Sequence, residues 1–247
     1  MSGTVEQHYE GLLSQHYSWM FGLPVELKAT EQLTLFKALG VGPGLSGLAI
    51  DLGCGPGYQS FALADLGAAP VLAIDTSRTL LNELDSHAGG RPVKTMRADI
   101  RDLSSLCKPS SVETLVCMGD TLTHLADRTE VQRLFADALS ALKVGGTLVL
   151  TYRDLSQPVE GLDRFLPVRA DDDRIMTCVL DFHPETVTVT DIVYCRDNGE
   201  WRMEKSSYEK LRLDPTWIED QLRDARFRID RSERVGGLQA IVARKPS

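Results

Sequence analysis

Short apolar runs alternate with stretches of helical periodicity from residue 48 to residue 152. The apolar runs lie at 48–52, 71–74, 93–96, 115–118 and 147–152, and helical spacing falls between them at 58–66, 79–87 and 130–143. Strands that alternate with helices form right-handed βαβ units, so this pattern predicts a parallel sheet covered by helices. The helix at 130–143 is expected to end in a cationic turn at Lys143, with a following glycine as its left-handed cap.

The pattern changes on both sides of this region. Helical spacing extends from Val5 to Leu39, and Gly22 and Pro24 divide it into two predicted helices. From 174 to 213, β-branched and aromatic residues alternate with polar ones around a hairpin turn at 198–199, which predicts three antiparallel strands inserted after the fifth parallel strand. A helix at 215–225 and a strand pair at 227–234 and 238–243 are expected to close the chain.

Composition narrows the classes of function. The 27 basic and 35 acidic residues give a net charge of -8, which disfavours nucleic acid as a partner. No apolar run is long enough to span a bilayer, and the sequence at 1–6 lacks the order of a secretory signal, so a cytoplasmic protein without membrane contact is expected. The 5 scattered cysteines contain no C-x-x-C pair, and no metal is expected.

The sharpest chemical signal is a glycine loop directly after the first apolar run. Gly53, Gly55 and Gly57 form G-x-G-x-G, in which a ligand can approach backbone N–H groups at a helix N-terminus. Tyr58 stands where a dinucleotide fingerprint needs its third glycine. Asp51 would repel a pyrophosphate beside this loop but would suit a ligand that carries an ammonium or sulfonium group.

Four aspartates each follow or end a predicted strand: Asp51, Asp75, Asp99 and Asp120. Parallel strands bring their carboxyl ends to one edge of a sheet, where α/β proteins bind ligands. Asp75 has roughly the separation from the glycine loop expected of a ribose-binding carboxylate, and Asp99 beside Ile100 could accept from an adenine amine. The sequence therefore predicts an adenosyl ligand at this edge.

The order AIDLGCGPG, VLAID, ADI, VCMGDTLTHL and LKVGGTLVLTYRD resembles the motifs of class I S-adenosylmethionine-dependent methyltransferases over 48–154. The runs at 119–125 and 152–154, with the late β insertion, are similar to glycine and sarcosine N-methyltransferases. This resemblance implies an α/β fold: a doubly wound, Rossmann-like, mostly parallel seven-stranded sheet with an antiparallel terminal strand, an N-terminal helical cover and a three-stranded antiparallel insertion. The expected regions are a cover at 1–44, a methyltransferase domain at 45–154 and 214–247, and an insertion over the substrate site at 155–213.

The resemblance also implies which residues bind S-adenosylmethionine and leave S-adenosylhomocysteine as product. The glycine loop and Asp51 would hold the methionine part, Asp75 the ribose and Asp99 the adenine, while Tyr17 covers the cofactor. The implied cofactor-binding residues are Tyr17, Asp51, Gly53, Cys54, Gly55, Gly57, Asp75, Thr76, Asp99, Ile100, Met118 and Gly119.

On the acceptor side, Arg153 matches the arginine that pairs with a substrate carboxylate in the glycine-methylating enzymes. Tyr152 and Tyr208 are further candidate substrate residues, and Asp120 or His124 could accept a proton from an amine. Asp120 stands where those enzymes carry asparagine, which leaves the acceptor open. The expected reaction is in-line methyl transfer to an amine nitrogen of a small, carboxylate-bearing metabolite.

Each candidate residue also has a structural interpretation. Asp75 could cap a helix, and Asp120 could be a cap or turn residue before the next helix. His124 could form a local hydrogen bond, and Arg153 could pair with Asp154 or Asp163. Tyr17 could belong to the buried stripe of an amphipathic helix. O-methylation of a small metabolite, a non-catalytic adenosyl-binding module and a homodimer also remain open at this point.

Overall fold

The computed structural model describes residues 4–42 and 44–247. Residues 1–3, which carry part of the argument against a secretory signal, lie outside the described chain, as does residue 43. Within the described residues, no helix is both long and apolar enough to cross a membrane.

Seven strands form the main sheet, in the order β10-β11-β5-β4-β1-β2-β3. Neighbours from β1 to β5 are parallel, whereas β11 runs antiparallel to both β5 and β10. The predicted fold class is therefore confirmed. The strands are β1 (Ala49–Leu52), β2 (Val71–Asp75), β3 (Val93–Arg97), β4 (Val112–Cys117), β5 (Leu142–Tyr152), β10 (Arg228–Val235) and β11 (Leu238–Arg244).

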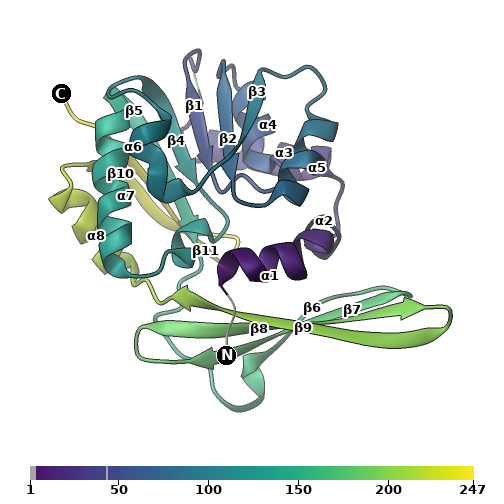
Figure 1. The fold of residues 1–247 in the computed structure, drawn as a ribbon. Helices are drawn as coiled ribbons and strands as arrows, with labels where there is room; N and C mark the ends of the chain where they lie inside the picture. Colours follow the sequence, from purple (N-terminus) through teal and green to yellow (C-terminus); the bar gives the residue numbers. More distant parts are fainter. Residues whose placement is uncertain (1–3, 43) are drawn as a thin grey trace.

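Helices bury both faces of this sheet (Figure 1). Alternate residues of one strand point to opposite faces: Leu115 packs with α7 and α8, and Val116 packs with α3 and α4. Buried side chains on both faces explain why these strands are continuously apolar in sequence. The helices are α3 (Val25–Ala38), α4 (Tyr58–Asp65), α5 (Arg78–His87), α6 (Leu103–Leu106), α7 (Arg128–Ala141) and α8 (Pro215–Asp224).

The expected cap after α7 is wrong. Asp127 caps the start of α7 by accepting from the Glu130 N–H, but the helix ends at Ala141 and Leu142 is already extended. Leu142 pairs with Val112 of β4, so the backbone from this point joins the sheet in place of another helical turn. Lys143 consequently belongs to β5.

The insertion contains four antiparallel strands, one more than predicted, in the order β6-β7-β8-β9. The first strand was missed because Pro167 and a register shift beside it interrupt the pattern, and proline is tolerated in an edge strand. The strands are β6 (Phe165–Ala170), β7 (Arg174–Phe182), β8 (Thr186–Asp197) and β9 (Glu200–Leu211).

The first part of the N-terminal cover lies between the two sheets, and its last helix packs on the main sheet. The cover comprises α1 (Val5–Gly11), a 3-10 turn, α2 (Tyr17–Phe21) and α3, so its first predicted helix is divided further. Gly22, at φ 75°, ends α2. Figure 1 shows α1 above the antiparallel sheet and below the parallel one. Leu13 packs on Met176 and Val193 of the insertion, whereas Phe36 joins the core of the main sheet.

Candidate active site

The glycine loop connects β1 to α4 with three left-handed residues, Gly53 at φ 71°, Gly55 at 52° and Gly57 at 93°. A Cβ on Gly53 would collide with the Thr121 side chain, and one on Gly57 would lie 2.6 Å from Leu84 of α5. Glycine is therefore required at both positions. The chain after β4 leaves no room for a side chain at Gly53, and the packing of α5 leaves none at Gly57.

Asp75 holds this loop from the end of β2. Its two oxygens accept from the N–H groups of Gly55 and Ser77, each at 2.8 Å. Burial raises the pKa of Asp75, against the effect of these hydrogen bonds. The Ser77 hydroxyl caps α5 by accepting from the Leu80 N–H. Asp75 is therefore not the side-chain cap of this helix, which was its alternative structural role. Asp75 lines a cavity instead.

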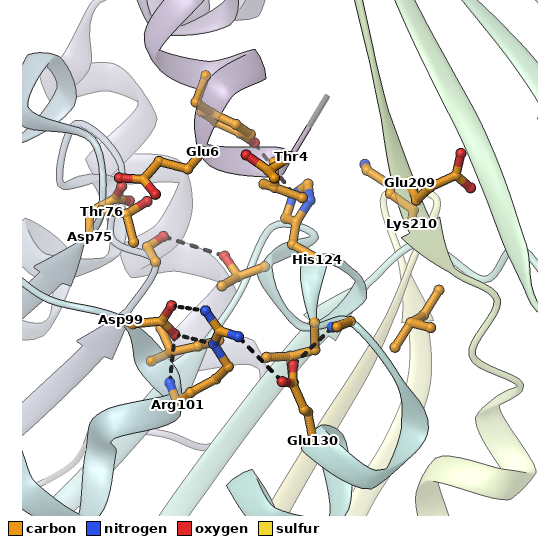
Figure 2. A pocket seen from close by; sticks show the side chains of 18 of the residues that line it. Thr4, Glu6, Asp75, Thr76, Asp99, Arg101, His124, Glu130, Glu209 and Lys210 are labelled. Atoms are coloured by element: carbon orange, nitrogen blue, oxygen red, sulfur yellow. Dashed lines mark hydrogen bonds and ion pairs between the residues drawn. The ribbon is translucent and has the colours of Figure 1, made fainter. Parts of the chain in front are cut away.

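This first cavity has a volume of about 470 Å³, within the usual range for ligand pockets. Side chains from β9, α1 and the loop after β4 surround it together with the strand-end residues (Figure 2). The predicted residues that line it are Tyr17, Gly53, Gly55, Asp75, Thr76, Asp99, Ile100 and His124.

Asp99 is engaged by a neighbour at the rim of this cavity. Arg101 donates to both of its oxygens, at 2.6 and 3.0 Å, and also pairs with Glu130 at 3.3 Å (Figure 2). Burial alone would raise the pKa of Asp99, but the hydrogen bonds from Arg101 lower it. The carboxylate therefore stays ionised, and its contact with an adenine amine remains a prediction.

Two predicted cofactor residues line neither cavity. Gly57 serves packing, as described, and Asp51 is only 1% exposed beneath the loop, where the Ser60 hydroxyl donates to it at 2.6 Å. Burial raises the pKa of Asp51 to about 7. Because Asp51 is buried beneath the loop, this geometry disfavours a direct contact between Asp51 and a ligand ammonium. The water-mediated contact stays a prediction.

A second cavity, of about 960 Å³, lies under the antiparallel insertion. The predicted residues that line this cavity and not the first are Cys54, Met118, Gly119, Asp120, Arg153 and Tyr208. The two cavities share six lining residues: Tyr9, Tyr17, Gly53, Thr121, His124 and Lys210. The cavity at the strand ends and the cavity under the insertion therefore meet along one wall.

Asp120 is the centre of an ionic cluster in the second cavity. Lys210 donates to one carboxylate oxygen at 2.8 Å, and the backbone N–H of Arg153 donates to the other at 2.7 Å. The Arg153 guanidinium lies 3.7 Å from Asp120. Burial alone would raise the pKa of Asp120, but the charge of Lys210 lowers it. Arg153 thus pairs with Asp120 and not with Asp154, which pairs with Arg234.

Sequence analysis missed Lys210 and Tyr9. Lys210 lies two residues after Tyr208 on β9 and so points to the same face of that strand. This spacing is the signal that could have found it. Tyr9 lies one helical turn before Leu13 in the cover and carried no comparable signal, because tyrosine in an amphipathic helix is common.

Aromatic rings cluster where the cavities meet. Tyr9 lies 5.7 Å from His124 and 6.1 Å from Tyr17, and His124 lies 5.4 Å from Tyr208, between ring centroids. Burial raises the pKa of all three tyrosines. Burial and then the charge of Lys210 lower the pKa of His124 to about 3. The four rings are therefore neutral near pH 7, and both His124 and the ionised Asp120 are weak bases.

Tyr152 does not reach either cavity. It is 0% exposed and packs in the core under α7 and α8, because the alternation along β5 turns it to that face. The structure thus separates it from Arg153, with which the sequence motif had grouped it. Across residues 4–42 and 44–247, no cluster of side chains suited to a metal ion occurs.

The comparisons with known proteins agree with this architecture. Residues 49–146 match the family model of a methyltransferase domain. The cypemycin N-terminal methyltransferase of a Streptomyces species is 34% identical over 111 residues, 45% of this chain and 42% of that protein. The glycine/sarcosine N-methyltransferase of Parasynechococcus marenigrum is 27% identical over 114 residues, 45% of this chain and 40% of that protein. The matched segments thus span less than half of each of these relatives.

Two solved structures superpose over nearly the whole chain. The CcbJ methyltransferase of Streptomyces caelestis has a TM-score of 0.78 at 19% identity, and the match covers 98% of this chain and 99% of that one. A S-adenosylmethionine-bound amino pentose methyltransferase of Micromonospora echinaspora has a TM-score of 0.70 at 15% identity, covering 94% and 95%. The chain has the fold of these methyltransferases. Residues 49–146 thus match a methyltransferase domain within a chain that has this methyltransferase fold, in agreement with the resemblance.

Proposed function

We propose that the protein transfers a methyl group from S-adenosylmethionine, in the first cavity, to an amine nitrogen of a small carboxylate-bearing acceptor in the second. The observation that carries the proposal is the shared wall of the two cavities, which is lined by neutral aromatic rings and bordered by a cationic cluster. An in-line displacement needs donor and acceptor to meet at such a junction with water excluded.

The first cavity fits the cofactor chemically. Asp75 has unused lone pairs for vicinal hydroxyls, and Gly53 and Gly55 leave the loop open to close approach by a ligand. Tyr9 and Tyr17 would present ring faces at the junction, and the positive charge of a sulfonium would be stabilised by them through cation–π interactions. The bound cofactor supplies an electrophilic methyl group, and the residues of this chain orient it and keep water away.

The second cavity fits an anion beside an amine. Within the Asp120 cluster, Lys210 and Arg153 supply two positive charges against one negative charge, which leaves an excess of one positive charge in that cluster. Asp191, another acid of this cavity, is held by His8 at 3.0 Å. A substrate carboxylate would balance the excess charge.

The names of the relatives favour nitrogen over oxygen as the acceptor atom. Two relatives are described as N-terminal and glycine/sarcosine N-methyltransferases, and a solved neighbour as an amino pentose methyltransferase. Methylation of a hydroxyl would require a base to remove its proton, and the low pKa values of Asp120 and His124 make both weak for this purpose.

A labelled-methyl assay against pooled small amines and hydroxy acids tests the proposal, with products identified by mass spectrometry. We expect methylation of an amine nitrogen and a raised KM in Arg153→Ala, whereas the surface control Arg223→Ala should match the wild type. Methylation of an oxygen atom would refute the amine as the acceptor. Binding of S-adenosylmethionine without methyl transfer to any acceptor would indicate a non-catalytic module. Light scattering tests whether the protein forms a homodimer.

A further inference from the structure

Lys210 occupies an unusual position for a lysine. Its side chain is 11% exposed, it lines both cavities, and it comes from β9, across His124 from Asp75 and Thr76 (Figure 2). Burial alone would lower the pKa of Lys210, but the charge of Asp120 and its hydrogen bond raise it above its usual value. The ammonium therefore stays charged in a largely dehydrated place.

The ammonium has hydrogen-bonding capacity to spare. It has three N–H donors, and in the described part of the chain it has one hydrogen-bond partner, Asp120. The neighbouring Glu209 points elsewhere and accepts from Thr188 at 2.6 Å. A buried ammonium with unused donors is costly unless a ligand completes its partners.

Arg153 differs from Lys210 in two respects. Its side chain is 53% exposed, and it lines the second cavity alone. A charge that water screens attracts a ligand less strongly than a dehydrated one. The stronger anion attraction should therefore act at Lys210, next to the place where the methyl group is transferred.

We propose that Lys210 is the main specificity-determining residue for the acceptor, binding its carboxylate through the donors that Asp120 leaves unused. Asp120 offsets part of the charge of Lys210 and holds its ammonium in place, so it tunes the attraction. Because Lys210 borders both cavities, the preferred acceptor carries its carboxylate close to the amine. The identity of the acceptor rests on the proposed function, whereas binding of the carboxylate does not.

The kinetic test uses pairs of acceptors that differ only in charge, glycine with glycinamide and β-alanine with β-alaninamide. We expect the wild type to prefer the acid of each pair, and Lys210→Met to lower the acid-to-amide ratio of kcat/KM by about ten- to a hundredfold. Lys210→Arg should retain the preference. Lys205→Met, on the exposed part of the same strand, is the matched control. An unchanged ratio in Lys210→Met would overturn the proposal.

A double variant separates recognition from structure, because Lys210→Met also leaves Asp120 without its partner. If Lys210 only neutralises Asp120, Lys210→Met with Asp120→Asn should recover the wild-type acid-to-amide ratio. If Lys210 binds the carboxylate, the double variant should remain deficient, and Asp120→Asn alone should bind carboxylates more tightly than the wild type. The two outcomes are opposite.

A binding experiment keeps the proposal testable if no acceptor is methylated. Protein saturated with S-adenosylhomocysteine is mixed with propionate or propionamide, and contact is measured by saturation-transfer NMR. We expect the wild type to bind propionate in preference to propionamide and Lys210→Met to lose that preference. Equal propionate binding by both proteins would refute the role of Lys210, whereas absence of methyl transfer alone would count only against the proposed function.

Discussion

Substitution of Asp75 by asparagine should weaken S-adenosylmethionine binding sharply. The carboxylate offers four lone-pair sites, of which the Gly55 and Ser77 N–H groups occupy two at 2.8 Å each. One site on each oxygen is left for the two ribose hydroxyls. Asparagine keeps the shape but loses the charge, and its amide nitrogen would face one of the backbone donors.

Hydrogen bonds to a charged group contribute about 1.5–3 kcal/mol, so Asp75→Asn should raise the Kd about ten- to a hundredfold. Isothermal titration calorimetry with S-adenosylmethionine and S-adenosylhomocysteine measures the change. Asp224→Asn, exposed on α8, serves as the control. Unchanged affinity in Asp75→Asn, with a folded protein by circular dichroism, would mean that the cofactor does not contact this strand end.

Two further predictions concern pH. His124 has a pKa of about 3 and the pKa of Asp120 is lowered, so neither group changes its protonation near neutral pH. We therefore expect log kcat/KM to rise with pH up to the pKa of the acceptor amine. A bend near pH 6.5 that His124→Gln removes would contradict this. Burial raises the pKa of Asp51 from 3.8 to about 7, so the folded state binds the carboxyl proton more tightly than the unfolded state. The free energy of unfolding should therefore fall by as much as about 4 kcal/mol as the pH rises from 3.8 to about 7. Asp51→Asn should therefore be more stable than the wild type in urea at pH 8 and not at pH 4; an equal difference at both pH values would show that the cause is not ionisation.

Local sequence pattern was sufficient to predict the main sheet and the strand ends that line the first cavity. The apolar runs are continuous because both faces of the sheet are buried, and the three loop glycines are needed for backbone conformation and close packing, so both leave traces in sequence. Asp75, Asp99 and Asp120 could be placed at one edge because parallel strands end together. Sequence analysis missed β6 because Pro167 interrupts the strand pattern, and an edge strand tolerates a proline that a central strand excludes.

The sequence by itself determined the strands of the main sheet and predicted the glycine loop as a cofactor site and an adenosyl compound as its ligand, because each of these depends on residues close together in the chain. Only the tertiary structure decided which side chains meet where the two cavities join. Lys210 is 90 residues from Asp120, yet their charged groups lie 2.8 Å apart, and Tyr152, adjacent to Arg153, points into the core. Such contacts depend on how the insertion and the N-terminal cover fold over the sheet, and no local periodicity encodes them.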